Sequence, residues 1–403
     1  MAQIKPFAAL RPKPSLADKI CELPYDVMSS AEAREMARGN SLSFLHVSKP
    51  EIDLPENIDP YDARVYAKGK ENFSRMMAEG SLVKDPQPYY YFYRQIMGSH
   101  SQTGLVAVAS CEDYLSGIVK KHELTRPDKE DDRVRHIETL DSQTGPVFLT
   151  YRADPQMVKI TAAQVAQSPD TDFTAADGIR HTSWTVRDPA AISAISAAFA
   201  AMPALYIADG HHRSAAAGRV YQSRKGAGDS AWFLSVIFPD NQLQILAYNR
   251  VLKKVPGLDA SQLLKKLQAI FDISPGSALP ATKHTLGLYL NGQWHALRFC
   301  GEITAGQSAL DSLDVSLLQK HVLAPIFGIA DPRTSKDIQF VGGIRGPAEL
   351  EKLVNTGEYS CAFAMYPTGI GDLMAIADTG GIMPPKSTWF EPKLRDAMFC
   401  HLI

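Results

Sequence analysis

The sequence predicts an α+β protein with a core domain over residues 1–255 and an additional C-terminal α/β lobe over residues 256–403. Three observations support this prediction. The 403 residues allow two to three domains at roughly 150 residues each. Strand and helix patterns mix without a fixed repeat in the first part, which is typical of α+β domains. A predicted helix over residues 262–270, flanked by Pro256-Gly257 and Ser274-Pro275-Gly276, is placed to join two lobes.

The elements of the core domain follow from capping residues, helical spacing of apolar residues, and short β-branched or aromatic runs. In chain order we expect a helix over 30–38, a helix over 61–79, a hairpin of strands 89–93 and 104–110, a strand over 146–151, a helix over 188–202 capped by Asp188, a strand over 204–208, a helix over 214–224, and strands 232–238 and 243–248 paired around Pro239-Asp240-Asn241.

The C-terminal lobe is expected to contain a strand pair around the tight turn Asn291-Gly292. After it we expect a helix over 315–323, a strand over 337–341, a helix over 346–355, a strand over 360–366 and a helix over 369–378. The tail MPPKSTWFEPKLRD is too rich in proline for regular structure.

Composition and charge exclude several classes of protein. The 42 Lys and Arg residues against 44 Asp and Glu residues give a net charge of −2, so no nucleic-acid partner is expected. No apolar run approaches the ~20 residues that cross a bilayer, and no secretory signal is visible, so we expect a cytoplasmic protein without a membrane partner. The five scattered cysteines lack a C-x-x-C pair and are expected to be reduced. The sequence leaves homo-oligomerisation open.

The strongest chemical signal is LYIADGHHRSAAA over residues 205–217. A strand that runs into a glycine turn and a small-residue helix directs backbone N–H groups, the positive end of the helix dipole and a guanidinium at one point, which suits a phosphate. The expected phosphate-binding residues are Gly210, His211, His212, Arg213 and Ser214. Asp209 is the expected Mg²⁺ ligand. The alternative is a capped helix whose two histidines only make hydrogen bonds, and adjacent imidazoles are expected to point in different directions.

Residues 206–217 resemble the phosphate-binding motif of the ParB/sulfiredoxin superfamily, in which a glycine turn with histidine and arginine opens a helix beneath a nucleotide. The segments IKPFAALRP, PYDVM, KHELTRPDKEDDRVRHI, LYIADGHHRSAAA, VGGIRG and MPPKSTWFEPKL together resemble the prokaryotic family called domain of unknown function ten-fifteen. The superfamily resemblance implies a ParB/sulfiredoxin-like nucleotide-binding core. Its members with a similar turn include kinases that phosphorylate free serine.

A kinase of this kind also needs a base near the acceptor hydroxyl and cations around the transferred group. The charged run over residues 120–136 can supply them, with Glu123 as the expected base and Arg126, Arg133 and His136 as expected substrate-binding residues. The alternative is an exposed ionic loop. Asp26 either points its carboxylate into the same site or caps the helix that begins near Ser30.

Two other segments are also candidates for an anion-binding site. The turn VGGIRGP over residues 341–347 is a second strand–glycine–helix unit. The guanidinium of Arg345 would bond two oxygens of the anion there. The tail segment 386–390 offers a lysine, two hydroxyls and an aromatic ring, and it is equally suited to pack Trp389 on the core.

These residues predict a Mg²⁺-dependent phosphotransferase that moves phosphate from ATP or ADP to a small hydroxylated metabolite, with free serine as the first choice. The partners expected are therefore a nucleotide and a small-molecule substrate. The alternative function is a non-catalytic CTP- or ATP-binding sensor, and a third alternative is a structural protein with a vestigial phosphate turn.

Overall fold

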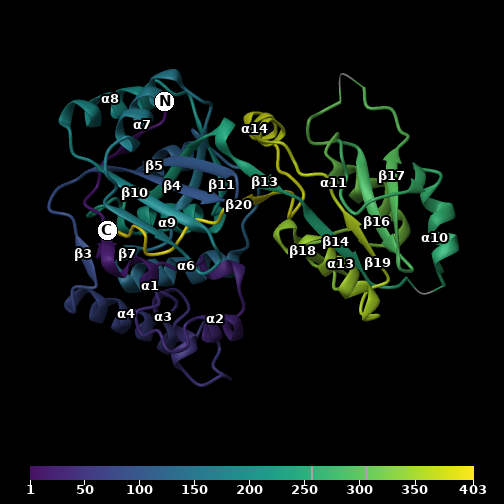
Figure 1. Cartoon of the computed structure of the whole chain (residues 1–403), viewed down its shortest axis with the longest axis horizontal. Helices are drawn as coiled ribbons and strands as arrows, with labels where there is room; N and C mark the ends of the chain where they lie inside the picture. The colour runs from purple at the N-terminus through teal and green to yellow at the C-terminus, as the bar shows by residue number, and fades with distance from the viewer. Residues whose placement is uncertain (256, 305–306) are drawn as a thin grey trace. The chain divides into compact units, whose positions relative to one another are not determined.

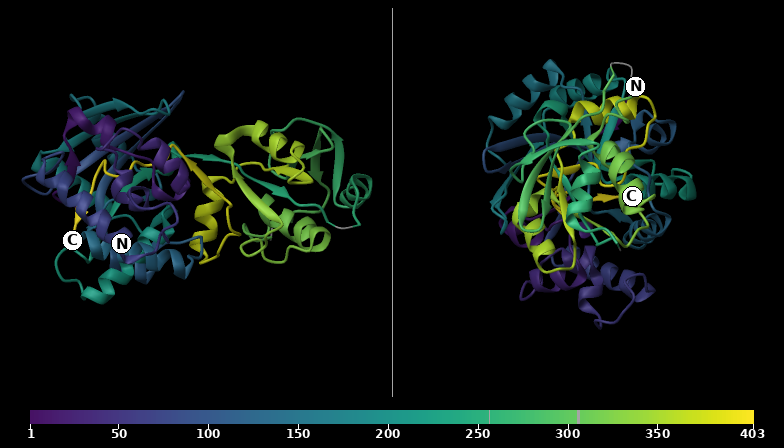
Figure 2. Two further views of the ribbon diagram at one scale, coloured as in Figure 1. Left: turned by 90° about the horizontal axis from the view of Figure 1, so that it is seen from below. Right: turned by 90° about the vertical axis from the view of Figure 1, so that its right-hand side faces the viewer.

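The computed structural model describes residues 1–255, 257–304 and 307–403. Pro256, where the sequence predicts the C-terminal lobe to begin, lies outside the described residues. The chain divides into two compact units, Met1–Leu243 with Pro392–Ile403, and Gln244–Glu391. Both chain ends therefore lie in the first unit (Figures 1 and 2).

This division differs from the predicted domains 1–255 and 256–403. The last segment of the chain belongs to the first unit because its strand β21 pairs with β7 and because Asp396 exchanges backbone hydrogen bonds with Glu22. Such contacts between distant segments leave no local trace in the sequence.

The first unit contains most of the helices and strands of the described chain. They are β1 (Ile4–Lys5), β2 (Leu10–Pro12), α1 (Ala17–Ile20), α2 (Ser30–Met36), α3 (Leu45–Ser48), α4 (Ala63–Ala78), β3 (Leu82–Lys84), β4 (Tyr90–Met97), β5 (His100–Ser110), α5 (Cys111–Ser116), β6 (Val119–Lys120), α6 (Pro127–Leu140), β7 (Ser142–Gln143), β8 (Val147–Tyr151), α7 (Pro155–Val165), β9 (Thr171–Thr174), β10 (Arg180–Val186), α8 (Pro189–Ala200), β11 (Leu205–Asp209), α9 (His211–Arg224), β12 (Trp232–Pro239) and β21 (His401–Leu402).

A large mixed sheet forms the centre of this unit. Its strand order is β6-β11-β8-β12-β5-β4-β10-β9, and β1 pairs with β5 at one side of the path. The ladders β6–β11 and β8–β12 are parallel and the other ladders of this sheet are antiparallel. Helices α7 and α8 lie above the sheet in Figure 1, and α6 with the N-terminal helices lies below it. The first unit is therefore a mixed α+β fold, as predicted.

Local signals explain several of these elements. Ser29 and Glu32 form a capping box at the start of α2, and the Asp188 carboxylate accepts N–H bonds at the start of α8. Proline at residue 127 occupies the first turn of α6, where a missing N–H costs nothing. The predicted hairpin of β4 and β5 is present with paired register.

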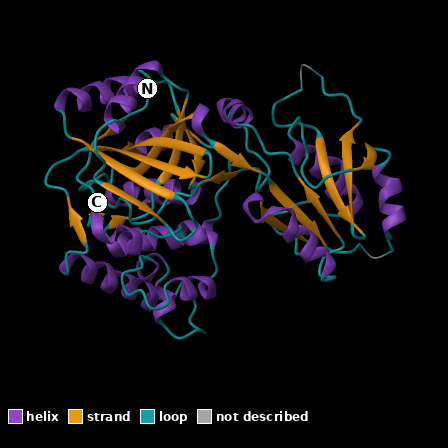
Figure 3. Ribbon diagram, viewed as in Figure 1, coloured by secondary structure: helices purple, strands orange, loops and turns teal. Residues whose placement is uncertain are grey.

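The second unit is built around a six-stranded sheet with the order β15-β17-β16-β19-β14-β18, and Figure 3 shows its strands with helices beside them. Its elements are β13 (Gln244–Leu246), β14 (Tyr248–Leu252), α10 (Ala260–Leu267), β15 (Phe271–Pro275), β16 (Thr285–Leu290), β17 (Gln293–Phe299), α11 (Asp314–Leu318), a π-helix (Gln319–Leu323), α12 (Ala324–Phe327), β18 (Ile338–Gly342), α13 (Gly346–Asn355), β19 (Cys361–Ala364), α14 (Ile370–Asp378) and β20 (Trp389–Glu391).

Three expectations are corrected here. All ladders of the six-stranded sheet are antiparallel, so the predicted α/β lobe is an α+β unit. Strands 232–238 and 243–248 do not pair with each other, because β12 lies between β5 and β8 while β13 pairs with β20. The proline-rich tail therefore contributes a strand, since β20 supplies the partner of β13. Among the described helices, none is long and apolar enough to span a membrane.

Candidate functional site

The turn between β11 and α9 contains a register shift at the end of β11 and one residue, Gly210, with a left-handed backbone conformation. The register of β11 against β8 shifts between Ile207 and Asp209, and bulges of this kind redirect a side chain at a strand end. Gly210 follows with a φ of +95° and forms the N-cap of α9 without a side-chain cap. Glycine at the N-cap supplies no side-chain acceptor to the first turn of α9, and helix N-termini of this kind bind anions.

Replacing Gly210 by alanine is expected to destabilise the first unit by about 1–2 kcal/mol from backbone strain alone. The added Cβ would also lie 3.1 Å from Arg213 Nε. Urea unfolding measures the change. Gly117→Ala is the matched control, since Gly117 has a φ of +82° and no atom near the added Cβ. Equal losses in the two variants would contradict a role for the Arg213 contact.

Arg213 folds back beneath this turn. Its side chain is 10% exposed, its Nη2 lies 3.8 Å from Asp209 Oδ2, and its Nη1 donates a 2.5 Å hydrogen bond to the carbonyl oxygen of Pro146. In the part of the chain that the structure describes, the buried Nε of Arg213 has no hydrogen-bond partner. A buried donor without an acceptor is costly, so this nitrogen favours a ligand or water beside the turn.

Asp209 lies between two cations. Lys393 Nζ donates to Asp209 Oδ2 at 3.2 Å, and Arg213 approaches the same oxygen. Burial raises the pKa of Asp209, but the charges of Lys393 and Arg213 outweigh that effect and hold the pKa below its ordinary value. Asp209 is therefore ionised in the folded protein at neutral pH.

Lys393 is a residue that sequence reasoning missed. It lies 184 residues from Asp209 along the chain, in the C-terminal segment of the first unit, and Gln95 Nε2 donates to its carbonyl oxygen at 2.8 Å. Its side chain is 11% exposed. No local pattern marks this lysine, because only the return of the tail to the first unit brings it to the turn.

The two histidines of the turn point to different surroundings, as expected for adjacent imidazoles. His211 is buried, its ring packs edge-on against His122 at 4.4 Å, and its Nδ1 lies 3.7 Å from Glu123 Oε2. Burial and the neighbouring His122 hold the pKa of His211 well below its ordinary value. Burial likewise lowers the pKa of His122 to about 4. His212 Nε2 instead accepts a hydrogen bond from the backbone N–H of Arg126 at 3.1 Å.

Ser214 does not contribute a donor to the open side of the turn. Its hydroxyl is buried and donates to the carbonyl oxygens of His211 at 3.0 Å and Gly210 at 3.4 Å. Serine inside a helix often bonds the preceding turn in this way. The prediction that Ser214 binds phosphate therefore gains no support from its hydroxyl, which is used within the helix.

The charged run over 120–136 is largely helix α6 rather than a loop. Arg126 is exposed and pairs with Asp128 at 2.9 Å. Arg133 is largely buried, pairs with Asp132 at 2.6 Å and stacks over the Tyr25 ring at 3.7 Å. His136 Nε2 donates to the Val47 carbonyl oxygen at 3.1 Å. The structure thus separates Arg126 from Arg133 and His136.

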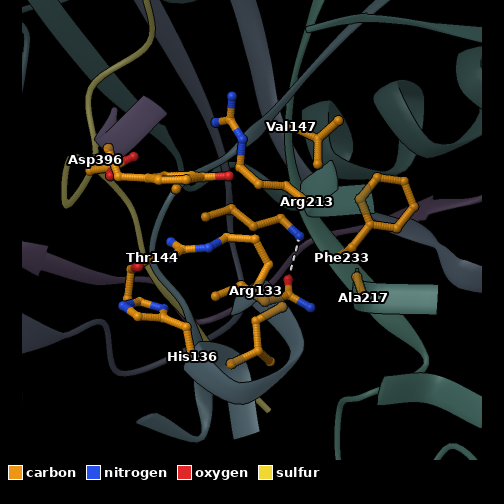
Figure 4. A pocket seen from close by; sticks show the side chains of 13 residues that line it. Arg133, His136, Thr144, Val147, Arg213, Ala217, Phe233 and Asp396 are labelled. Atoms are coloured by element: carbon orange, nitrogen blue, oxygen red, sulfur yellow. Dashed lines mark hydrogen bonds between the residues drawn. The ribbon is translucent and has the colours of Figure 1, made fainter. Parts of the chain in front are cut away.

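Arg133, His136 and Arg213 meet in one pocket of the first unit (Figure 4). The pocket has a volume of about 30 Å³ and lies between α6, α9, the segment around Gly145 and the C-terminal segment, which contributes Asp396. Two of the predicted substrate-binding residues therefore share a pocket with the arginine of the phosphate turn.

The competing segments are used for packing in the second unit. Gly342 lies against Trp389, because a Cβ at residue 342 would lie 2.7 Å from the indole ring, and Gly343 N–H donates to the Ala247 carbonyl oxygen at 2.7 Å. Trp389 also packs edge-on against Tyr248. These contacts favour the alternative in which the tail packs Trp389 against the rest of the protein, and this packing lies within the second unit.

A family model described as "Protein of unknown function (DUF1015)" matches residues 4–316. The chain belongs to this family. The DUF1015 match includes the β11–α9 turn, Glu123 and α6, and it ends before the C-terminal segment that supplies Lys393 and Asp396. No curated protein matches the sequence.

Solved structures show a distant likeness to this DUF1015 chain. A free serine kinase in complex with AMP has 14% identity and a TM-score of 0.36 over 71% of this chain and 86% of that chain. SbnI with a C-terminal truncation from Staphylococcus aureus has 10% identity and a TM-score of 0.40 over 72% and 85%. A conserved hypothetical protein from Pyrococcus furiosus has 15% identity and a TM-score of 0.36 over 73% and 93%.

Proposed function

We propose that the first unit is a ParB/sulfiredoxin-like core that binds ATP or ADP and transfers a phosphoryl group to the hydroxyl of a small metabolite, with free serine as the first acceptor to test. The observation that carries this proposal is the β11–α9 turn, where an uncapped helix N-terminus, Arg213 and Lys393 converge around Asp209.

The turn supplies the groups that hold phosphate oxygens. The backbone N–H groups of His211 and His212 open α9, and the helix dipole favours negative charge there. Arg213 and Lys393 add two cations, of which the guanidinium can bond two oxygens at once. Asp209 holds both cations in place through its ionised carboxylate. Phosphoryl transfer depends mainly on this kind of positioning and charge neutralisation.

Glu123 is proposed as the base. Its carboxylate lies 3.7 Å from His211 Nδ1, next to the first turn of α9. In the proposed step, the acceptor oxygen forms a bond to the terminal phosphorus of the nucleotide, the bond to the leaving ADP or AMP oxygen breaks, and the acceptor proton passes to the Glu123 carboxylate. Neutral His211 adds no charge that would compete for that carboxylate.

The donor set does not fit Asp209 as the holder of a resident Mg²⁺. One oxygen of Asp209 is paired with Lys393 and Arg213, and the other accepts the Gly210 N–H at 3.0 Å. Among the described residues, no group of three or more His, Cys, Asp or Glu side chains could hold a metal ion. We therefore derive no step through a protein-held metal, and any Mg²⁺ needed would enter with the nucleotide.

The test is a transfer assay with the full-length protein. ATP, ADP and CTP are each supplied with Mg²⁺ and a panel of hydroxylated amino acids and hydroxy acids, and phosphorylated product is measured by mass spectrometry. Phosphoserine that forms from ATP or ADP supports the proposal. Nucleotide binding without product on any acceptor would contradict it and favour the sensor alternative, and no thermal shift with any nucleotide would contradict both.

A further inference from the structure

Three buried polar side chains lie in a row across the central sheet of the first unit. His181 on β10 is directly opposite Gln95 on β4, and Gln95 is directly opposite Gln102 on β5. Residues that are directly opposite in an antiparallel ladder point to the same face of the sheet. All three side chains are fully buried. Buried polar groups need hydrogen-bond partners, so the partners of this row indicate its role.

The two glutamines form a directional chain of hydrogen bonds. Gln102 Nε2 donates to Gln95 Oε1 at 3.1 Å, and Gln95 Nε2 donates to the carbonyl oxygen of Lys393 at 2.8 Å. At the other end of the chain, His100 Nε2 donates to Gln102 Oε1 at 3.1 Å. Each amide accepts one bond and donates the next, an arrangement in which successive bonds strengthen each other. The chain ends on the backbone of the C-terminal segment.

Other residues on this face of β4 also contact the C-terminal segment. Tyr91, Tyr93 and Gln95 alternate along the strand and therefore point to one side. The Phe399 ring lies 5.1 Å from the Tyr91 ring and 6.1 Å from the Tyr93 ring. Phe92, which points to the opposite side, belongs to the large apolar core. One face of β4 thus packs on the C-terminal segment and the other face packs on the core.

His181 binds the basic residue two positions after Lys393. Arg395 Nε donates to His181 Nε2 at 3.1 Å, and the Arg395 guanidinium pairs with Asp177. Burial and the charge of Arg395 hold the pKa of His181 well below its ordinary value, so the neutral ring accepts this bond. In the described structure residues 392–395 belong to no helix or strand. Contacts with the polar row therefore help to determine where Lys393 lies.

We propose that Gln95 and Gln102 are positioning residues, which hold the Lys393 backbone so that its ammonium group reaches Asp209 of the phosphate turn. Lys393 Nζ lies 3.2 Å from Asp209 Oδ2. Without the Gln95 donor, the buried carbonyl oxygen of Lys393 loses its bond from the amide. The segment is then expected to shift toward another donor, because an unsatisfied buried acceptor is costly. The effect on nucleotide binding rests on the proposed function, whereas the positioning of Lys393 does not.

The first test measures the exposure of Lys393 in the protein without nucleotide. Wild type and Gln95→Met are treated with acetic anhydride, and acetylation of each lysine is followed by mass spectrometry. Methionine is similar in length to glutamine but offers no N–H. Lys393 is expected to react about tenfold faster in the variant, the effect of one lost buried hydrogen bond. Lys49, which is 13% exposed and pairs with Glu51, is the internal reference and should react at the wild-type rate.

Gln164→Met is the matched control. Gln164 is also buried, and its Nε2 donates to the backbone carbonyl oxygen of Thr185 at 3.3 Å. The substitution removes the same kind of bond at a carbonyl outside the C-terminal segment, so Lys393 should stay protected. Equal acetylation of Lys393 in wild type and Gln95→Met would overturn the proposal. An equal rise in Gln164→Met would overturn it as well, since it would indicate a general loosening of the fold.

Gln102→Met is the second variant, and it decides the matter if Gln95→Met does not fold. It leaves the Gln95 donor in place and removes only the bond that orients the Gln95 amide. Acetylation of Lys393 is expected to rise in the same direction but by less. A folded Gln102→Met protein with wild-type acetylation of Lys393 would contradict the role of the chain.

Titration with ADP and Mg²⁺ tests the consequence at the phosphate turn. Gln95→Met is expected to weaken ADP affinity about tenfold, because a charged hydrogen-bond donor is displaced. In a protein that already carries Lys393→Met, the same substitution should have no further effect, since a positioning residue acts only through its target. Losses that add in the double variant would show an independent structural role and overturn the proposal. Gln164→Met should bind ADP like wild type.

The two measurements separate failure of this positioning role from failure of the proposed function. Faster acetylation of Lys393 in Gln95→Met, together with no phosphoserine in the transfer assay, would retain the positioning role and reject the kinase. Phosphoserine formation with the same KM for ATP and the same acetylation of Lys393 in wild type and Gln95→Met would retain the kinase and reject the positioning role.

Discussion

Glu123→Gln is expected to lower the rate of phosphoserine formation by about 10²–10⁴-fold, the usual contribution of a general base. Glutamine keeps the size of the side chain and its distance from His211, but it cannot accept the hydroxyl proton. Nucleotide affinity should change little, because the phosphate-binding groups belong to the β11–α9 turn. The measurement is kcat for transfer alongside a nucleotide titration of the same preparation.

The control for this variant is Glu112→Gln, which makes the same change at an exposed residue in the first turn of α5. It should retain full activity. A Glu123→Gln enzyme with more than a tenth of wild-type kcat would contradict the assignment of Glu123 as the base. A loss of nucleotide binding in the same variant would instead indicate that Glu123 organises the turn through His211.

Elements that are determined by residues adjacent in the chain could be predicted from the sequence. The β4–β5 hairpin, the Asp188 cap of α8 and the strand–glycine–helix unit of β11 and α9 each follow from residues adjacent in the chain. The pairing of β13 with β20 could not be predicted in this way, because it joins segments far apart in sequence. Proline content was misleading in the tail, since β20 (Trp389–Glu391) lies between Pro385 and Pro392 and forms a two-stranded sheet with β13.

In the candidate site too, residues adjacent in the chain could be predicted and residues from a distant segment could not. The residues of the turn from Asp209 to Arg213 are contiguous, so their chemistry is visible in the sequence. Lys393 and Asp396 reach the same region only because the C-terminal segment returns to the first unit. The direction of the Ser214 hydroxyl could not be predicted, because residue type does not say which way a hydroxyl points in a helix, and here it donates to the carbonyl oxygen of His211.

Arg213→Gln is expected to destabilise the first unit by about 1.5–3 kcal/mol, the usual contribution of a hydrogen bond made by a charged group. The substitution leaves Asp209 with Lys393 alone, and it removes the hydrogen bond to the Pro146 carbonyl oxygen. It also removes the cation that acts most strongly on Asp396. Urea unfolding monitored by circular dichroism measures the difference.

Arg219→Gln is the matched control on the same helix. Arg219 is 42% exposed and pairs with Glu130 and Asp131 at the surface, so its loss should cost about 1 kcal/mol or less. Similar losses in the two variants would show that Arg213 is no more than a surface charge.

The pH dependence gives a sharper check on Arg213. Its charge lowers the folded-state pKa of both Asp209 and Asp396. Asp209, whose folded pKa lies below the unfolded value, contributes stability that is present above about pH 4. Asp396, whose folded pKa is about 7, costs stability as the pH rises toward that value, and without Arg213 this cost continues to grow above pH 7. The part of the stability gap between wild type and Arg213→Gln that comes from Asp209 should be constant above about pH 4. The gap should therefore widen mainly from pH 7 to pH 8, and a gap that stays constant over this range would mean that the pKa of Asp396 does not depend on this arginine.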